Sequence, residues 1–179
     1  MSVTVAYDDS ASLPNVTAVL ITREFAYPSI SLGCSFGETI VETNCPNVFR
    51  RYELARRAQH DVIYVQDDDC EIDVATLWLQ FDGRLTNAIR EHDLQFYRGT
   101  GVTLLGFGTF FPKVMVDFTR WTSRYEMDLD EADRIFSYLN QPHNSVVMPI
   151  RIIERATRMS DRPDHYDRLR KVMSQLGTL

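Results

Sequence analysis

The chain has 179 residues, of which 44% are hydrophobic, 25% charged and 11% aromatic. These values exclude wholesale disorder and collagen-like repeats, and the length favours one compact domain over residues 1–179. The net charge of −6 argues against a protein that holds nucleic acid by electrostatic attraction alone.

The first half of the chain alternates between strand and helix patterns. A continuous apolar, β-branched run over Val16–Thr22 predicts a strand buried on both faces. This alternation predicts right-handed βαβ units, and therefore an α/β fold with a mostly parallel sheet flanked by helices. A short helix over Pro28–Cys34 and a turn at Ser35–Gly37 are predicted next, followed by a strand over Thr39–Thr43. Asn47 is expected to cap a helix over Val48–Gln59, and a further strand is predicted over Asp61–Gln66.

The second half continues the alternation less regularly. Asp73 is expected to cap a helix over Val74–Phe81, which ends at an Asp-Gly turn. Two further helices are predicted over Asp130–Leu139 and from Pro163 to about Gln175. Strands are predicted over Leu85–Ile89, Val102–Phe111 and Ser145–Ile152.

The cysteines and the N-terminus favour a cytoplasmic protein. Cys34, Cys45 and Cys70 form no CxxC pair, so we expect neither a secreted disulfide framework nor a structural zinc site. The N-terminus lacks the pattern of a signal peptide. No apolar stretch approaches the roughly 20 residues of a membrane span.

Three adjacent aspartates, Asp67, Asp68 and Asp69, directly follow the third predicted strand. Ligands of open α/β sheets bind beyond the carboxyl ends of the strands. Three neighbouring carboxylates repel one another, and Mg²⁺ or Mn²⁺ offsets that repulsion because these ions favour oxygen ligands. The alternative is a solvated acidic turn at the start of the next helix, where the helix dipole favours negative charge. The apolar strand before the triplet favours the metal site.

These residues also carry a resemblance to a known family. VIYVQDDDCEID resembles the DXD region of nucleotide-sugar-dependent glycosyltransferases with the GT-A fold. AVLITRE looks like their first strand, ETIVETNCPNVFRRYELARRA like the second strand and its helix, and LLGFGTFF like the segment under the donor sugar. DEADRIFSYL resembles the region of the acidic catalytic residue, and MSDRPDHYDRLR a C-terminal segment that supplies a histidine. The resemblance implies a single Rossmann-like GT-A domain of the small type found in phages and bacteria.

A metal-dependent glycosyltransferase of the EC 2.4 type is the activity that this resemblance implies. It would move a sugar from a nucleotide sugar, with a UDP-sugar as first choice, to an acceptor hydroxyl. Mn²⁺ or Mg²⁺ would neutralise the departing nucleoside diphosphate and would be held by Asp69, Asp67 and His165. The nucleotide and donor sugar would contact Thr22, Arg23, Asn44, Arg51, Asp67, Asp68, Gly106 and Gly108.

Asp133 and Glu131 are the candidates for the base that deprotonates the acceptor. On one helix they point about 200° apart, so only one can face the site. Asp133 is preferred because its neighbours are apolar, whereas Glu131 is expected near the solvated first turn. Purely structural roles stay open for several of these residues. Asp133 and Glu131 could compensate the helix dipole, and Arg51 and His165 could be solvated surface residues. Gly106 and Gly108 could form a strand bulge.

The acceptor and two rival functions also stay open. Residues 151–179 carry seven Lys/Arg and four Asp/Glu, which suits an anionic acceptor such as a modified DNA base; a virion protein and a small molecule are the alternatives. One rival function is a sugar-phosphate nucleotidyltransferase. It would usually show a Gly-rich basic loop after the first strand, where this chain reads TREFAYPSISLG. The other is a non-catalytic nucleotide-sugar-binding or virion protein.

Overall fold

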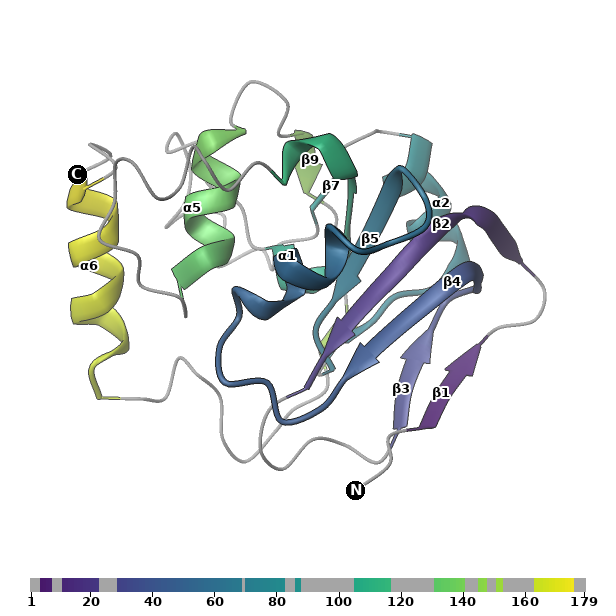
Figure 1. The fold of residues 1–179 in the computed structure, drawn as a ribbon, viewed down its shortest axis with the longest axis horizontal. Helices are drawn as coiled ribbons and strands as arrows, with labels where there is room; N and C mark the ends of the chain where they lie inside the picture. The colour runs from purple at the N-terminus through teal and green to yellow at the C-terminus, as the bar shows by residue number, and fades with distance from the viewer. Residues whose placement is uncertain are drawn as a thin grey trace.

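The computed structural model (Figure 1) describes residues 4–7, 11–22, 29–68, 70–82, 86–87, 105–116, 131–140, 145–147, 151–152 and 163–175. In chain order the strands are β1 (Thr4–Tyr7), β2 (Ser12–Ile21), β3 (Ser29–Leu32), β4 (Ser35–Glu42), β5 (Val62–Gln66), β6 (Cys70–Glu71), β7 (Thr86–Asn87), β8 (Thr109–Pro112), β9 (Ser145–Val147) and β10 (Arg151–Ile152). The helices are α1 (Arg50–Ala55), α2 (Val74–Asp82), α5 (Ala132–Leu139) and α6 (His165–Gln175), with 3₁₀ turns η1 (Leu105–Phe107) and η2 (Lys113–Met115).

The main sheet has six strands in the order β4-β2-β5-β8-β7-β9. The β4–β2 and β2–β5 pairs are parallel, β8 is antiparallel to both β5 and β7, and β7 pairs with β9 in parallel. Two small sheets, β1–β3 and β6–β10, accompany it. The prediction of an α/β, Rossmann-like domain with a mixed sheet flanked by helices is confirmed for the part of the chain that the structure describes.

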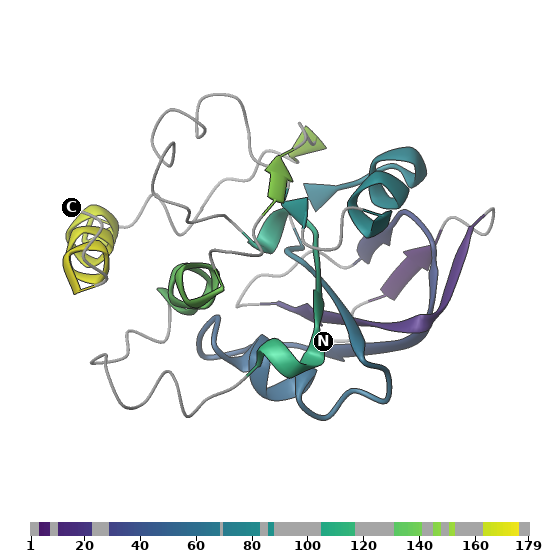
Figure 2. The same ribbon diagram turned by 90° about the horizontal axis from the view of Figure 1, so that it is seen from above.

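The two faces of the sheet are buried in separate hydrophobic clusters. Val19 of β2 and Phe111 of β8 belong to one cluster, with residues of α1 and α5. The neighbouring residues Leu20 and Phe110 belong to the other, together with Leu77 of α2. Successive side chains of a strand point to opposite faces, so a continuous apolar run is what burial on both faces requires. Figure 2 shows α2 and α1 on opposite sides of the sheet.

Two local predictions before β4 are wrong. The segment predicted as a short helix from Pro28 contains strand β3, which pairs in parallel with β1, and the turn predicted at Ser35–Gly37 is the start of β4. Pairing with β1 and β2 supplies the backbone hydrogen bonds that the local pattern could not foresee. Position 37 inside β4 needs a glycine, because a Cβ there would overlap the Pro14 carbonyl of β2.

The later elements follow the predicted order with different bounds. Asp73 caps α2 as predicted, because its carboxylate accepts the Thr76 backbone N–H at 2.8 Å. Asn47 is not the cap of α1, which begins after Phe49 without a side-chain cap. The strand expected over Val102–Phe111 is divided into η1 and β8, and the one expected over Ser145–Ile152 into β9 and β10, which belong to different sheets.

The C-terminal helix α6 is attached through Val172, which lies in the same cluster as Ile135 and Phe136 of α5. Figures 1 and 2 both place α6 beside α5, at the far end of the molecule from β1 and β3. Over the described residues, no helix combines the length and the apolar content that a membrane crossing needs.

Candidate functional site

The candidate site lies at the carboxyl ends of the parallel strands β2 and β5. Leu20 pairs with Gln66 in the β2–β5 register, so Thr22 and the Asp67–Asp68 pair leave the sheet at the same edge. This edge is where open α/β sheets bind ligands. Three further segments reach it: α1, η1 and the start of α5.

Arg51 joins two of these segments through a buried ion-pair network. Its side chain is 2% exposed; Nη1 donates to Asp133 Oδ2 at 3.0 Å, and Nη2 donates to Asp67 Oδ1. Burial lowers the pKa of Arg51, but the charges of Asp133 and Asp67 outweigh this effect and raise the pKa overall. Arg51 is therefore a fixed positive charge between two carboxylates, not the solvated helix arginine considered above.

Tyr52 completes the contacts of Asp133. The buried phenol donates to Asp133 Oδ1 at 2.6 Å, and its ring stacks on Phe136 with centroids 4.8 Å apart. Burial raises the pKa of Tyr52 well above its usual value, and the charge of Asp133 adds to that effect. Both oxygens of Asp133 thus accept hydrogen bonds from α1, and α5 is fixed to α1 through this carboxylate.

Gly106 of η1 makes room for Asp67. Its carbonyl accepts the Asp67 backbone N–H at 2.6 Å, and a Cβ at position 106 would overlap the Asp67 carboxylate. Gly108 has a different role: its φ is +86°, and a Cβ there would meet the side chain of Ile72. The structure therefore brings Gly106 to Asp67, while backbone conformation explains Gly108.

Thr22 contributes a buried hydroxyl at the end of β2. Its backbone carbonyl accepts the Cys45 N–H at 2.8 Å, and the preceding Asn44 adopts a left-handed conformation with φ 58°. The Thr22 side chain is 1% exposed, and its Oγ1 has no hydrogen-bond partner within the described ranges. Because an unpaired buried hydroxyl costs about 1–3 kcal/mol, it marks a place where a ligand or an ordered water is expected.

Glu131 does not lie where it was predicted. The expectation of a solvated first turn is wrong, since Glu131 is 1% exposed and forms an ion pair with Arg134. Carboxylates are rarely buried unless they are paired, and Arg134 lies one helical turn further on. The prediction that the neighbourhood of Asp133 is buried is confirmed, because Ala132, Ile135 and Phe136 all belong to the core.

Three predicted site side chains fall outside the part of the chain that the structure describes. Arg23 and Asp69 lie outside the described residues, as does the side chain of His165, which begins α6. Asp68 is half-buried beside Asp67. Of the predicted residues, the structure brings Arg51, Asp67, Gly106 and Asp133 into contact.

Oxygen donors that suit a hard divalent cation are present at this edge. Asp67 is 38% exposed and stands beside Asp68, while Arg51 balances only part of the negative charge. Among the residues that the structure describes, no three His, Cys, Asp or Glu side chains are grouped closely enough to hold a metal. The donor chemistry fits Mg²⁺ or Mn²⁺, and Asp69 and His165 would have to complete the ligand set.

Tyr52 was missed as a site residue. Its signal in the sequence is its place on the apolar face of the helix predicted over Val48–Gln59, because a buried phenol usually needs a hydrogen-bond partner. The local sequence pattern does not identify that partner, because Asp133 lies far away in the sequence.

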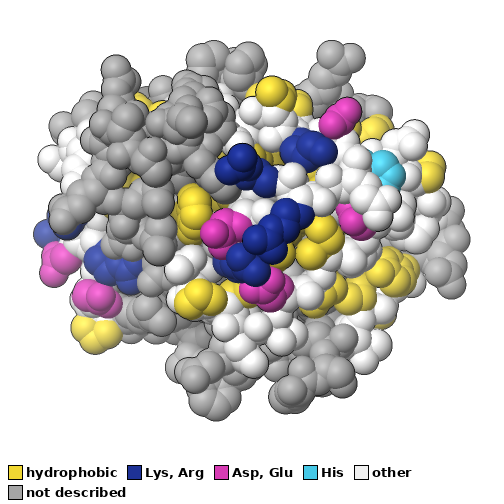
Figure 3. Space-filling model, viewed as in Figure 1, with side chains coloured by type: hydrophobic (Ala, Val, Ile, Leu, Met, Phe, Trp, Pro, Cys, Tyr) yellow, Lys and Arg dark blue, Asp and Glu magenta, His cyan; other side chains and the backbone are white. Residues whose placement is uncertain are grey.

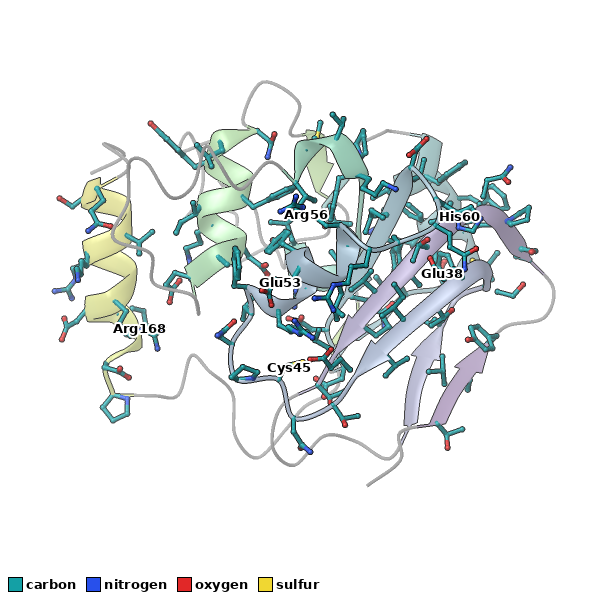
Figure 4. All side chains as sticks on the ribbon, in the orientation of Figure 1. Glu38, Cys45, Glu53, Arg56, His60 and Arg168 are labelled. Atoms are coloured by element: carbon teal, nitrogen blue, oxygen red, sulfur yellow. The ribbon has the colours of Figure 1, made fainter. Side chains whose placement is uncertain are left out.

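A second polar cluster lies at the opposite end of the strands. Thr17 Oγ1 donates to Glu38 Oε2 at 2.7 Å and lies 3.1 Å from His60 Nδ1. Figure 4 shows Glu38 and His60 together near one end of β4, and Cys45 near the other. This cluster is therefore separate from the candidate site.

The exposed side of α1 carries charges of both signs. Arg50 donates to Glu42 at 2.6 and 2.8 Å and to Glu53 at 2.9 Å. Figure 3 shows basic and acidic side chains next to one another near the centre of this face. Such pairing leaves no single-sign patch around Arg50.

No model of a known protein family matches the chain, and a search of curated proteins finds no match either.

Proposed function

We propose that the protein is a metal-dependent glycosyltransferase that moves a sugar from a nucleotide sugar, with a UDP-sugar as first choice, to an acceptor hydroxyl. The observation that carries this proposal is the position of Asp67. It follows β5 at the ligand-binding edge of the sheet, contacts Gly106 and is held by the buried Arg51. A fixed carboxylate at this edge suits a polar, cation-dependent ligand such as a nucleoside diphosphate.

The Thr22 hydroxyl, which has no hydrogen-bond partner among the residues that the structure describes, supports a ligand at the same edge. It comes from β2, the neighbour of β5 in the sheet, and a nucleoside offers both donors and acceptors for such a group. Asn44 lies on the adjacent segment, whose Cys45 N–H binds the Thr22 carbonyl. We assign Thr22, Asn44 and Asp68 to the nucleotide, and Asp67 to both the nucleotide and the cation.

Mn²⁺ or Mg²⁺, when bound, would neutralise the charge that develops on the nucleoside diphosphate as it leaves. Asp69, Asp67 and His165 are the proposed ligands. Gly106 allows the Asp67 carboxylate to lie close to the backbone of η1, and Arg51 pairs with that carboxylate when no cation is bound.

The base role of Asp133 stays a prediction. Two hydrogen bonds, from Arg51 and Tyr52, stabilise its charged form, and a carboxylate held in this way is a weaker base. We therefore regard Asp133 first as the residue that orients Arg51. Asp133→Asn tests both roles. If Asp133 is the base, turnover should fall by about 10²-fold or more while nucleotide affinity stays near that of the wild type. If Asp133 orients Arg51, Mn²⁺-dependent nucleotide binding should weaken as well.

Calorimetric titration with UDP, GDP and CDP, each with and without Mn²⁺, tests the proposal. We expect one nucleotide to bind in a Mn²⁺-dependent manner, and Asp69→Ala to abolish that dependence. Asp61→Ala is the matched control, because Asp61 is almost fully exposed at the opposite end of β5. Equal nucleotide affinity in the presence of EDTA would overturn the metal assignment.

Transfer itself is tested by the release of nucleoside diphosphate from a nucleotide sugar in the presence of candidate acceptors. A modified DNA base, a protein and a small molecule remain the acceptor classes. An anionic acceptor held by residues 151–179 would bind less tightly as salt increases, because phosphate contacts release counterions. Nucleotide binding without turnover would favour a non-catalytic protein, and turnover of a nucleoside triphosphate with a sugar phosphate would favour a nucleotidyltransferase.

A further inference from the structure

We propose that Arg51 is an internal cation that competes with the metal ion for the Asp67 carboxylate, so that tight metal binding depends on the phosphates of the nucleotide. This inference rests on the proposed function and concerns the regulation of the same site. It makes Arg51 a positioning residue that sets cation affinity.

The first step of the argument is the position of Arg51. Its guanidinium is fully charged and buried, and one of its two terminal nitrogens is hydrogen-bonded to Asp67. Asp67 itself is more than one-third exposed, so a dissolved cation has access to the same carboxylate. Arg51 and the metal ion are therefore alternative partners for one negative charge.

The second step is the role of Asp133. A buried arginine that lost its partner would be strongly unfavourable, and this cost would normally prevent Asp67 from exchanging one cation for another. Here Asp133 binds the other terminal nitrogen of Arg51 and is itself held by Tyr52. Arg51 thus remains paired when Asp67 turns toward a metal ion, and the exchange becomes feasible.

The third step concerns the nucleotide. A cation that must displace a guanidinium gains less from Asp67 than from a free carboxylate. A nucleoside diphosphate adds oxygen ligands and negative charge, which compensate for that loss. Mn²⁺ alone should therefore bind weakly to the wild-type protein, and Mn²⁺ and the nucleotide should strengthen each other's binding by the same factor.

The experiment measures the affinity of Mn²⁺ alone, by calorimetry, for a set of folded variants. Arg51→Gln removes the competing charge and should bind Mn²⁺ at least about 10-fold more tightly than the wild type. The double variant Arg51→Gln/Asp67→Asn should lose that gain. Arg50→Gln is the matched control, because it removes the same charge from the neighbouring position, where Arg50 pairs with Glu42 and Glu53; its Mn²⁺ affinity should stay within about twofold of the wild-type value.

Two further variants protect the test against misfolding. Arg51→Lys keeps the charge, but an ammonium lacks the fork that spans two carboxylates, so Mn²⁺ affinity should again rise. Asp133→Asn removes the second partner of Arg51, which then holds Asp67 more firmly, so Mn²⁺ affinity should fall severalfold. If the network had a purely structural role, the Arg51 variants and Asp133→Asn would not change Mn²⁺ affinity in opposite directions.

Unchanged or weaker Mn²⁺ binding by folded Arg51→Gln and Arg51→Lys would overturn the inference, as would the absence of Mn²⁺ binding in every variant. The proposed function fails separately, if the wild type binds no nucleotide with Mn²⁺ present. A tighter Mn²⁺ complex of Arg51→Gln in that case would still support competition at Asp67.

Discussion

Tyr52 donates a hydrogen bond of 2.6 Å to Asp133, and this contact joins α1 to α5. The preceding residue, Arg51, donates to the other oxygen of the same carboxylate at 3.0 Å. Successive side chains of a helix point about 100° apart, so Asp133 must lie in the angle between them. One acidic residue therefore fixes the position of α5 relative to the end of β5.

Loss of the Arg51 charge should destabilise the fold strongly. Arg51→Met leaves Asp67 and Asp133 without their shared partner, and breaking a buried ion pair in this way costs about 3–5 kcal/mol. Urea unfolding at pH 7 measures the effect. The triple variant Arg51→Met/Asp67→Asn/Asp133→Asn removes all three charges and should recover part of the loss; a triple variant less stable than Arg51→Met would contradict this explanation.

Stability at alkaline pH should depend on Tyr52. The folded-state pKa of Tyr52 is raised above the unfolded value of about 10, so its contribution is fully present below pH 10 and is lost as the pH rises beyond it. Tyr52→Phe should lose about 1.5–3 kcal/mol at pH 7, because the hydrogen bond to a charged group disappears. Above pH 10, its stability should then fall less steeply than that of the wild type.

Tyr166 provides the control for this prediction, because it is an exposed tyrosine on α6. Urea midpoints of Tyr166→Phe should follow the wild-type pH profile. A Tyr52→Phe variant with the same alkaline slope as the wild type would show that another group controls unfolding there.

Gly106→Ala should displace Asp67. The added Cβ would overlap the carboxylate, and overpacking of this kind costs about 1–3 kcal/mol. We expect both lower stability and weaker Mn²⁺-dependent nucleotide binding, measured by unfolding and calorimetry. Gly108→Ala is strained by its φ of +86° and meets Ile72 rather than Asp67, so it should lose stability but retain binding once folded. If Gly106→Ala binds the nucleotide as tightly as the wild type, Asp67 does not belong to the binding site.

The Thr17–Glu38–His60 cluster should affect stability in acid without affecting the ligand. Burial raises the pKa of Glu38, but hydrogen bonds from the Gln59 backbone and the Thr17 hydroxyl outweigh it, and the pKa is lowered overall. The stability that Glu38 contributes is therefore present above pH 4.5 and is lost as the pH falls through its folded-state pKa.

Thr17→Val removes one of these hydrogen bonds and should cost about 1 kcal/mol at pH 7. Glu38→Gln should reduce the change of the urea midpoint with pH between pH 3 and 5. Nucleotide affinity should be unchanged in both variants, since the cluster lies at the amino end of β5; a loss of binding in folded Thr17→Val would show that the two ends are coupled.

The strands and the acidic edge could be predicted because their signals are local. Val16–Thr22 and Asp61–Gln66 are apolar runs that only double-sided burial explains, and both are strands in the structure. Asp73 caps α2 through a contact three residues away. The position of Asp67 at the end of a parallel strand follows from the same local pattern.

The rest depended on contacts between distant parts of the chain. The strand identity of Ser29–Leu32 comes from pairing with β1, which no local periodicity reports. Arg51 was recognised as a candidate, but its two partners lie on β5 and α5, and burial of the pair decides its role. Glu131 is expected in solvent from its place in the first helical turn, where a carboxylate suits the helix dipole, and only the folded structure shows its buried pair with Arg134.

The antiparallel insertion of β8 has a consequence for the order of folding. Strands β2, β4 and β5 and helix α1 come from one continuous stretch, residues 12–66, whereas β8 and α5 must return from far along the chain to meet them. Contacts between distant segments form slowly, so we expect the parallel half to form first and Arg51 to become buried only when α5 docks. A ligand at this edge would then slow unfolding more than it accelerates folding.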